Sequence, residues 1–367
     1  MQVRTPDYYL QFKCIAGACT DSCCAGWQVD VDDRSYAYYE TVTGEFGDRL
    51  RSVMIKGKRG AEGRFRIGSD GRCPFLNENN LCDLYTALGE DALCTTCEMY
   101  PRYVTDFGNT REMGIALSCV TAAELIMGQQ GEKGFVEHED EDLFLVLNDI
   151  DGLFYINMLQ AREKVYGILW NRDISMADRL VLLLEYAKLL EAHRDNPECF
   201  AGLDAKMPSA IPATDAAKSY GLFWKYYLKQ AIIKKEWALT GMKALELLKK
   251  GEFDCKAIPE LLEQYSSEFE NIATYFVYRY FLQAVFDNRI TDRIKMCVVS
   301  ILMILQSYYV DSIVRQEEPD FDRRVWLTHV YSRELEHSEE NFARLLKILG
   351  KKKVFSADNL ISLLLLT

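Results

Sequence analysis

Beyond residue 134, hydrophobic residues recur every three to four positions, the spacing of a helix with one buried face. The strongest patterns cover 259–286 and 291–314. The longest largely apolar run, 296–305, is about half the roughly 20 residues that a membrane-spanning helix needs. We therefore expect a buried helix there and no membrane association. The other predicted helices cover 139–147, 155–170, 176–193, 216–238, 243–250, 332–349 and 359–366.

Local signals mark some of the expected helix ends. Ser175 followed by Asp178 has the form of a capping box, with Asp in place of the usual Glu. Pro212 fits a helix boundary, and Gly350 fits a stop directly after Leu349. Because helical patterns dominate the whole of 135–367, we predict that this region is an all-α helical bundle.

The first 127 residues show no sustained period. They hold 12 of the 22 glycines and nine of the 12 cysteines. Helices are expected at 83–93 and 116–127, and the basic, glycine-rich stretch 49–72 predicts turns and a short hairpin. The segment 128–134 is a candidate linker. The predicted fold is thus mainly α, with a small cysteine-rich, loop-rich domain over 1–127, mostly non-helical in its first 80 residues, before the helical domain over 135–367.

Composition and charge narrow the function classes. The chain has 367 residues, 49% of them hydrophobic and 27% charged, which is ordinary for a folded protein. Its formal net charge is -12, so we expect no general nucleic-acid binding, which needs a positive surface. The first residues lack the apolar core of a signal peptide. We therefore expect a cytoplasmic protein whose thiols stay reduced.

Twelve cysteines in a reducing compartment suggest a metal site rather than disulfides. Four of them, Cys14, Cys19, Cys23 and Cys24, fall within 11 residues. All four histidines lie beyond the cysteine-rich region, so any metal there is bound mostly or wholly by sulfur. The three scattered cysteines are interpreted as ordinary packing residues: Cys199, Cys255 and Cys297.

The spacing favours an iron–sulfur cluster, with zinc as the alternative. A structural zinc site usually has two CxxC-like pairs, and here one such pair exists, Cys94 with Cys97. The adjacent Cys23 and Cys24 suit a single tetrahedral ion poorly, because neighbouring side chains diverge. Motifs of other enzyme classes are absent: the Cx3Cx2C triad of radical enzymes, GxGxxG, the P-loop and GxSxG. No catalytic residue is assigned from the sequence.

Over roughly residues 5–127 the sequence resembles the flagellin lysine-N-methylase family and the broader group of cysteine-cluster proteins with zinc- or iron-chelating domains. The helical remainder is similar to that family in length and character only. Two departures are Cys94, where the family tends to have a small polar residue, and Val120-Thr121 in place of Pro-Glu. The resemblance rests on Tyr8-Tyr9-Leu10-Gln11-Phe12-Lys13-Cys14-Ile15, Cys19, Asp21-Ser22-Cys23-Cys24-Ala25-Gly26-Trp27, Cys73-Pro74-Phe75-Leu76, Leu81-Cys82, Leu88-Gly89-Glu90, Thr96-Cys97-Glu98-Met99-Tyr100-Pro101-Arg102 and Leu117-Ser118-Cys119.

The resemblance implies a protein-lysine N-methyltransferase that uses S-adenosylmethionine and acts on flagellin or another surface protein. It also implies a cysteine-bound centre, a 4Fe–4S cluster or zinc, that is structural, binds the methyl donor or senses redox state. Eight thiols exceed the four ligands of one cluster, so either two centres exist or half of the eight are packing residues. The eight metal-ligand candidates are Cys14, Cys19, Cys23, Cys24, Cys73, Cys82, Cys97 and Cys119.

Arg102 and Tyr100 are the candidate cofactor-binding residues. The planar guanidinium of Arg102 suits the carboxylate of the methyl donor, and the alternative is a structural salt bridge to Asp83 or Glu98. We expect Arg102 to face a donor site at the seam between the two domains. The alternative function is a non-enzymatic metal-binding module with a helical partner-binding domain. Saturable binding of S-adenosylmethionine would discriminate the two.

Overall fold

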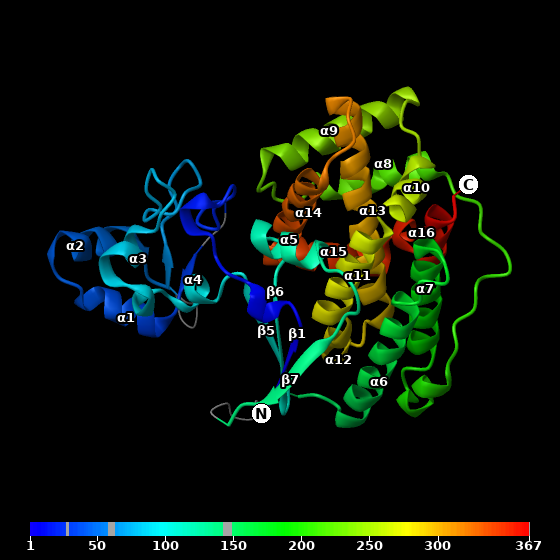
Figure 1. Ribbon diagram of the computed structural model, residues 1–367, viewed down its shortest axis with the longest axis horizontal. Helices are drawn as coiled ribbons and strands as arrows, with labels where there is room; N and C mark the ends of the chain where they lie inside the picture. The colour runs from blue at the N-terminus through cyan, green and yellow to red at the C-terminus, as the bar shows by residue number, and fades with distance from the viewer. Residues whose placement is uncertain (27–28, 58–62, 142–148, 367) are drawn as a thin grey trace.

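The computed structural model describes residues 1–26, 29–57, 63–141 and 149–366. Within these residues the chain is mainly helical, as predicted (Figure 1). A smaller lobe with many loops, built from the early part of the chain, stands beside a large helical bundle. Trp27 and most of the predicted helix at 139–147 lie outside the described residues, and Glu139 itself belongs to a strand.

The centre of the bundle is the long helix α13, which is buried along most of its length. Its length and hydropathy would suit a membrane span, but 83% of the apolar stretch is buried against the rest of the protein. This confirms the predicted buried helix at 296–305. The helices of this region are α6 (Gly152–Leu169), α7 (Met176–Ala192), α8 (Ala216–Tyr227), α9 (Lys235–Lys250), α10 (Ala257–Gln264), α11 (Ser266–Tyr280), α12 (Ala284–Asp287), α13 (Ile290–Arg315), α14 (Phe321–Glu336), α15 (Glu339–Lys351) and α16 (Ala357–Leu364).

Three predicted helices are interrupted. The helix expected at 216–238 breaks after α8, and the N–H groups of Ile233 and Lys234 bond to the Glu334 carboxylate of α14 instead of continuing a helix. The helix expected at 259–286 breaks at Tyr265, and that at 332–349 breaks after His337. Ser175 caps α7 as predicted, accepting from the N–H of Asp178 at 3.0 Å. Two end signals are wrong: α15 continues through Gly350 to Lys351, and no described helix starts or ends at Pro212.

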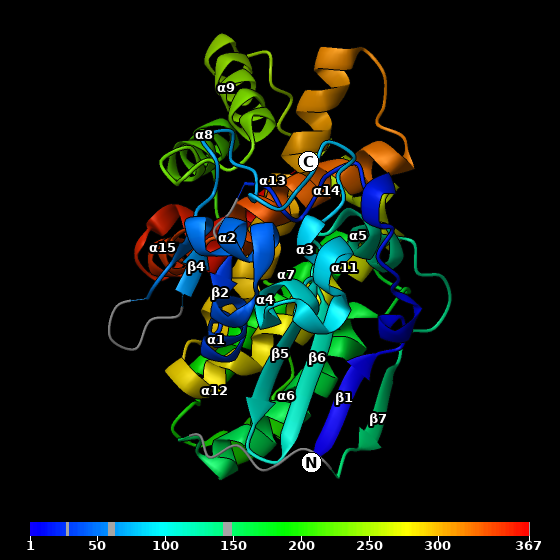
Figure 2. The same ribbon diagram turned by 90° about the vertical axis from the view of Figure 1, so that its left-hand side faces the viewer.

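A four-stranded sheet joins the start of the chain to residues far along it (Figure 2). Its order is β5 (Arg102–Phe107), β6 (Thr110–Ile115), β1 (Gln2–Pro6) and β7 (Phe135–Glu139). Strand β1 runs parallel to β6 and antiparallel to β7. The segment 128–134, expected as a linker, therefore leads directly into an edge strand of this sheet.

The smaller lobe has its own hydrophobic core, formed by residues between Val29 and Cys94. It holds α1 (Asp33–Thr41), α2 (Gly44–Val53), α3 (Asp83–Leu88), α4 (Thr95–Met99) and a small sheet of β2 (Asp30–Val31), β4 (Gly63–Phe65) and β3 (Met54–Ile55). The antiparallel β3 and β4 correspond to the predicted hairpin. The helix expected at 83–93 ends early, at Leu88, because Gly89 has a φ of 90°.

Other parts of the first 127 residues belong to the core of the bundle. Tyr8, Phe12 and Phe107 are buried in it, together with α5 (Val120–Met127), which starts four residues later than predicted. The division at 127/135 stays a prediction, because the hydrophobic core of the bundle crosses it. The loops that carry the cysteines therefore lie between the small lobe and the bundle.

Candidate functional site

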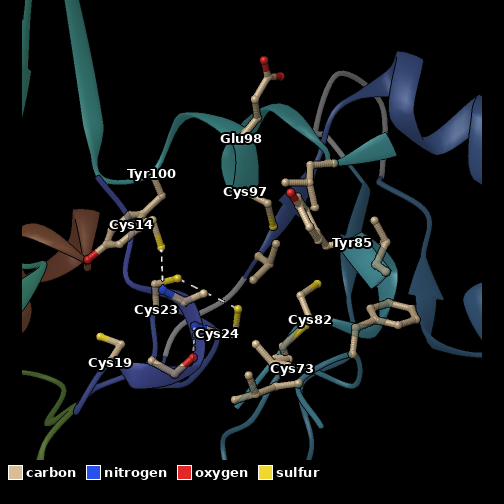
Figure 3. A pocket seen from close by; sticks show the side chains of 18 of the residues that line it. Cys14, Cys19, Cys23, Cys24, Cys73, Cys82, Tyr85, Cys97, Glu98 and Tyr100 are labelled. Carbon is tan, nitrogen blue, oxygen red and sulfur yellow. Dashed lines mark hydrogen bonds between the residues drawn. The ribbon is translucent and has the colours of Figure 1, made fainter. Parts of the chain in front are cut away.

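All nine cysteines of the first 119 residues line one cavity of about 620 Å³. Figure 3 shows this cavity with Cys14, Cys19, Cys23, Cys24, Cys73, Cys82 and Cys97 labelled. The eight metal-ligand candidates are therefore brought together, although up to 105 positions separate them in the chain. Cys94 joins them, and the two candidate cofactor-binding residues Tyr100 and Arg102 line the same wall. The cavity is the main concentration of reactive side chains in the described part of the chain.

Short turns and helix starts hold the cysteines in place. Cys14 and Cys19 flank a helical turn at Ala16–Ala18. The Cys73 N–H donates to the Cys24 carbonyl oxygen at 2.7 Å, and Leu76 pairs with Cys82 in an isolated β-bridge. The remaining positions are at helices: Cys82, Cys94 and Cys119 directly precede α3, α4 and α5, and Cys97 lies within α4.

The thiols surround the cavity instead of converging on one point. Among the described residues, no three His, Cys, Asp or Glu side chains are close enough to share one metal ion. A tetrahedral zinc ion, with zinc–sulfur bonds of about 2.3 Å, holds its sulfurs roughly 3.8 Å apart. A polynuclear cluster spreads its four thiolates over its outer corners. The donor set and the cavity therefore fit a sulfur-bound cluster better than a single ion.

Burial raises the pKa of several of these thiols. It is the main cause that raises the pKa of Cys73 to about 12 and that of Cys119 to about 11. Two thiols shift the other way: the hydrogen bond with Cys23, whose sulfur is 4.0 Å away, lowers the pKa of Cys24 to about 7, and the hydrogen bond with Cys97 lowers the pKa of Cys94. Several thiolates can coexist in this cavity if a cationic metal centre compensates their charge.

Arg102 makes no ion pair with a carboxylate in the described structure. Its guanidinium lies over the rings of Tyr9 and Phe12, 5.9 and 5.4 Å from the ring centroids. The alternative of a salt bridge to Asp83 is wrong, because Asp83 pairs with Arg49 at 2.7 Å. No ion pair to Glu98 is found among the described side chains either. Arg102 therefore presents a cation to the cavity wall.

Tyr100 is held more firmly than Arg102. Its hydroxyl donates to the Ser118 carbonyl oxygen at 2.7 Å, and its ring meets the edge of His337 with centroids 5.3 Å apart. His337 directly follows α14, so Tyr100 connects the cavity wall to the bundle. The ring of Tyr100 remains part of the cavity lining, while its hydroxyl has a structural partner.

A buried ionic cluster was not foreseen from the sequence. Asp21, between Cys19 and Cys23, pairs with Lys234 at 2.5 Å, His329 at 2.8 Å and Arg333 at 2.7 Å. Arg333 also donates to the carbonyl oxygens of Ser22 and Ala25. His329 and Arg333 are fully buried on α14. The cysteine loop is thus fastened to the bundle by one carboxylate, and no local sequence signal marks partners more than 200 positions away.

A second cavity of about 600 Å³ adjoins the first, and Lys13 and Thr121 line both. Phe321 of α14 contributes to it, so this cavity lies at the seam between the sheet region and the bundle. The cysteine cavity itself is lined, among the described residues, by positions 12–121 alone. The expectation that Arg102 faces the seam stays a prediction; its cavity shares Lys13 and Thr121 with the cavity at the seam.

Comparisons with known proteins found one family model and three curated relatives. A family model described as the FliB lysine N-methylase C-terminal domain matches residues 162–363, more than half of the chain. This match lies in the helical region, where the sequence resemblance was one of length and character only. No solved structure matches.

Three curated relatives are each 28% identical over 131 residues, 34% of this chain. One is the flagellar biosynthetic protein FliU of Salmonella muenchen, of which the match covers 76%. The others are the Lysine-N-methylases of Salmonella typhimurium and Salmonella choleraesuis, of which it covers 32%. The chain thus matches about a third of the length of these two methylases.

Proposed function

The chain belongs to the FliB lysine N-methylase family, and on that premise we propose that it is a protein-lysine N-methyltransferase. The proposed methyl donor is S-adenosylmethionine, and the proposed substrate is flagellin or another surface protein. The observation that carries the proposal is the cavity in which nine thiols and the ion-pair-free guanidinium of Arg102 meet. We further propose that the reaction takes place in the cytoplasm.

Arg102 is proposed to hold the carboxylate of the methyl donor. A planar guanidinium donates two parallel hydrogen bonds to a carboxylate, and this one has no competing acid among its described neighbours. The rings of Tyr9 and Phe12, over which it lies, fix the direction of the Arg102 guanidinium. The ring of Tyr100, also in the cavity wall, offers an aromatic face to the positively charged sulfonium of the donor.

A cysteine-bound iron–sulfur cluster is proposed as the resident cofactor, with zinc as the alternative metal. When bound, such a centre would cross-link the loops that supply its thiolates and so hold the cavity wall in place. The ligands would come from the eight candidate cysteines that line the cavity.

The second cavity is proposed to receive the target lysine. It carries two carboxylates, Asp7 and Glu124, and two aromatic rings, Tyr8 and Phe321, a lining that suits an alkylammonium group. Methyl transfer requires the lysine nitrogen to lose its proton and to lie in line with the methyl carbon. Two adjoining cavities that share Lys13 and Thr121 allow donor and acceptor to approach from separate sides.

Co-expression with flagellin tests this proposal. Mass spectrometry of the flagellin should show added multiples of 14 Da on lysines when the intact chain is present, and none when it is absent. Saturable binding of S-adenosylmethionine to the purified holoprotein should accompany the modification. A holoprotein that loads its metal, fails to bind the donor and leaves flagellin unmodified would contradict the proposal and favour a metal-binding module.

A further inference from the structure

We infer that the eight candidate cysteines form two separate four-thiol sites, each of which holds its own iron–sulfur cluster. This inference rests on the cysteine-bound centre proposed above and assigns every thiol to one of two places. The first site, called the lobe site, consists of Cys24, Cys73, Cys82 and Cys97. The second, called the loop site, consists of Cys14, Cys19, Cys23 and Cys119.

The lobe site belongs to the small core. Cys73 is buried in that core, and Cys24, Cys82 and Cys97 pack against it from the side of the cavity. The backbone hydrogen bond from Cys73 to Cys24 and the bridge from Leu76 to Cys82 tie three of the four chain segments together. Figure 3 shows the side chains of Cys24, Cys73, Cys82 and Cys97 around the same part of the cavity.

The loop site lies toward the bundle. Cys119 packs against the core of the bundle, at the start of α5, and not against the small core. Figure 3 places Cys14, Cys19 and Cys23 on the other side of Cys24 from the lobe cysteines. Proximity within this set shows in the electrostatics: after burial, the thiols of Cys19 and Cys14 contribute to the raised pKa of Cys119.

The adjacent Cys23 and Cys24 are the point where the two sites meet. Cys24 packs against the small core, whereas Cys23 is not among the described residues that do, so the two neighbours are assigned to different sites. Their sulfurs are 4.0 Å apart at the boundary between the two sets. Each set then has four thiols, the number that a 2Fe–2S or 4Fe–4S cluster takes from cysteine.

Cys94, the ninth thiol, is set apart by its place in the small core. It is 1% exposed, against 6% for Cys73, and its S–H lies 3.5 Å from the carbonyl oxygen of Asp30 in β2. It is also the position where the family that the sequence resembles tends to have a small polar residue. Cys94 is therefore a packing residue beside Cys97, and eight thiols remain for two complete sites.

Iron and acid-labile sulfide per chain, measured after anaerobic purification, test the inference. One double variant, Cys73→Ser with Cys82→Ser, removes the lobe site, and another, Cys23→Ser with Cys119→Ser, removes the loop site. We expect each to retain about half of the iron of the parent chain. Cys94→Ala and the double variant Cys199→Ser with Cys255→Ser, which alters two cysteines outside the cavity, should retain all of it.

Electron paramagnetic resonance of the reduced proteins provides the second readout. Each half-loaded variant should show a single, sharper signal, and the parent should show two interacting signals because the sites share a boundary. Loss of all iron in either double variant, full iron in both, or a parent chain that binds no iron would overturn the inference. Methylation of flagellin by a parent chain with one cluster would overturn the second site and leave the proposed function intact.

Discussion

Arg102 is a charged side chain whose place is set by aromatic rings, and this makes its contribution to ligand binding easy to isolate. Because no carboxylate pairs with it among the described residues, its removal leaves no orphaned charge behind. Phe12 is buried in the core of the bundle and Tyr9 packs against that core, so both rings keep these contacts when the guanidinium is removed. Function and stability are therefore separable at this residue.

We predict that Arg102→Ala weakens binding of S-adenosylmethionine while the metal content stays unchanged. Loss of a charged hydrogen-bonded pair costs about 2 kcal/mol, or roughly thirtyfold in Kd. Calorimetric titration of the holoprotein measures the change. Arg51→Ala is the matched control, because Arg51 is a partly exposed arginine on α2 that pairs with Asp48. Donor binding by Arg102→Ala at the strength of the parent would contradict the assignment.

Glu270 shows the opposite case, a residue whose role is purely one of stability. Its buried carboxylate pairs with Lys133, with Arg172 at 2.9 Å and with Arg179 at 2.7 Å. Burial by itself raises the pKa of this carboxyl, but the hydrogen bonds from Arg172, Lys133 and Arg179 outweigh it and lower the pKa to about 2. The charged form is therefore favoured in the folded state.

We predict that Glu270→Gln lowers the free energy of unfolding at pH 7 by about 3 to 5 kcal/mol, because it leaves two buried cations uncompensated. A depressed pKa contributes stability above the unfolded value near 4.5, and that contribution is lost as the pH falls toward 2. Urea titrations should therefore show that the difference in the free energy of unfolding between parent and variant becomes smaller below about pH 4.5. Glu317→Gln, at an exposed ion pair, should change little.

At the scale of elements, α9 carries a glycine in its interior for a steric reason. A Cβ on Gly241 would lie 2.7 Å from Trp224 and 2.9 Å from Leu228, both next to the buried contact between α8 and α9. Gly167 in α6 is the contrasting position, with no heavy atom within 4 Å of an added Cβ. The same substitution thus meets a filled space in one helix and open space in another.

We predict opposite signs for alanine at these two glycines. Gly241→Ala should destabilise the protein by about 1 to 3 kcal/mol, because overpacking exceeds the gain in helix propensity. Gly167→Ala should stabilise it by about 0.5 to 1 kcal/mol, because alanine is the better helix former. Thermal unfolding of both variants gives the comparison. A stabilised Gly241→Ala would show that α8 and α9 adjust freely to the extra methyl group.

At the scale of the whole molecule, the cysteine loop and the bundle are connected through Asp21. Its carboxylate is hydrogen-bonded to Lys234 and His329 and forms an ion pair with Arg333; these partners come from the start of α9 and from α14. Burial by itself raises the pKa of Asp21, but its partners outweigh this and lower it far below the usual range. The loop with the first four cysteines is therefore positioned by the bundle as well as by its own turns.

We predict that Asp21→Ala releases this loop while the bundle remains folded. Hydrogen–deuterium exchange should accelerate over residues 14–25 and over the adjoining face of α14, because Lys234 and Arg333 lose their shared counter-ion and His329 loses a hydrogen-bond partner. Asp48→Ala removes an exposed ion pair on α2 and should leave exchange over 14–25 unchanged. If exchange over 14–25 were the same in Asp21→Ala and the parent, the loop would be held by its turns alone.

The sequence by itself determined the helical character of the bundle, the buried position of α13 and the cap at Ser175. These features depend on contacts within a few residues: a hydrophobic stripe repeats every turn, and a cap bonds three positions ahead. The predicted bounds of the helices at 155–170, 176–193 and 291–314 therefore agree with α6, α7 and α13 within three residues.

The tertiary structure alone decided the features that join distant positions. The pairing of β1 with β6 and β7 spans more than 100 residues, and at the break before α9 the backbone bonds to the Glu334 carboxylate of α14. The Asp21 cluster and the arrangement of the thiols around the cavity likewise bring remote segments together. Such contacts leave no periodic trace in the sequence, because each depends on the path of the whole chain and not on the residues beside it.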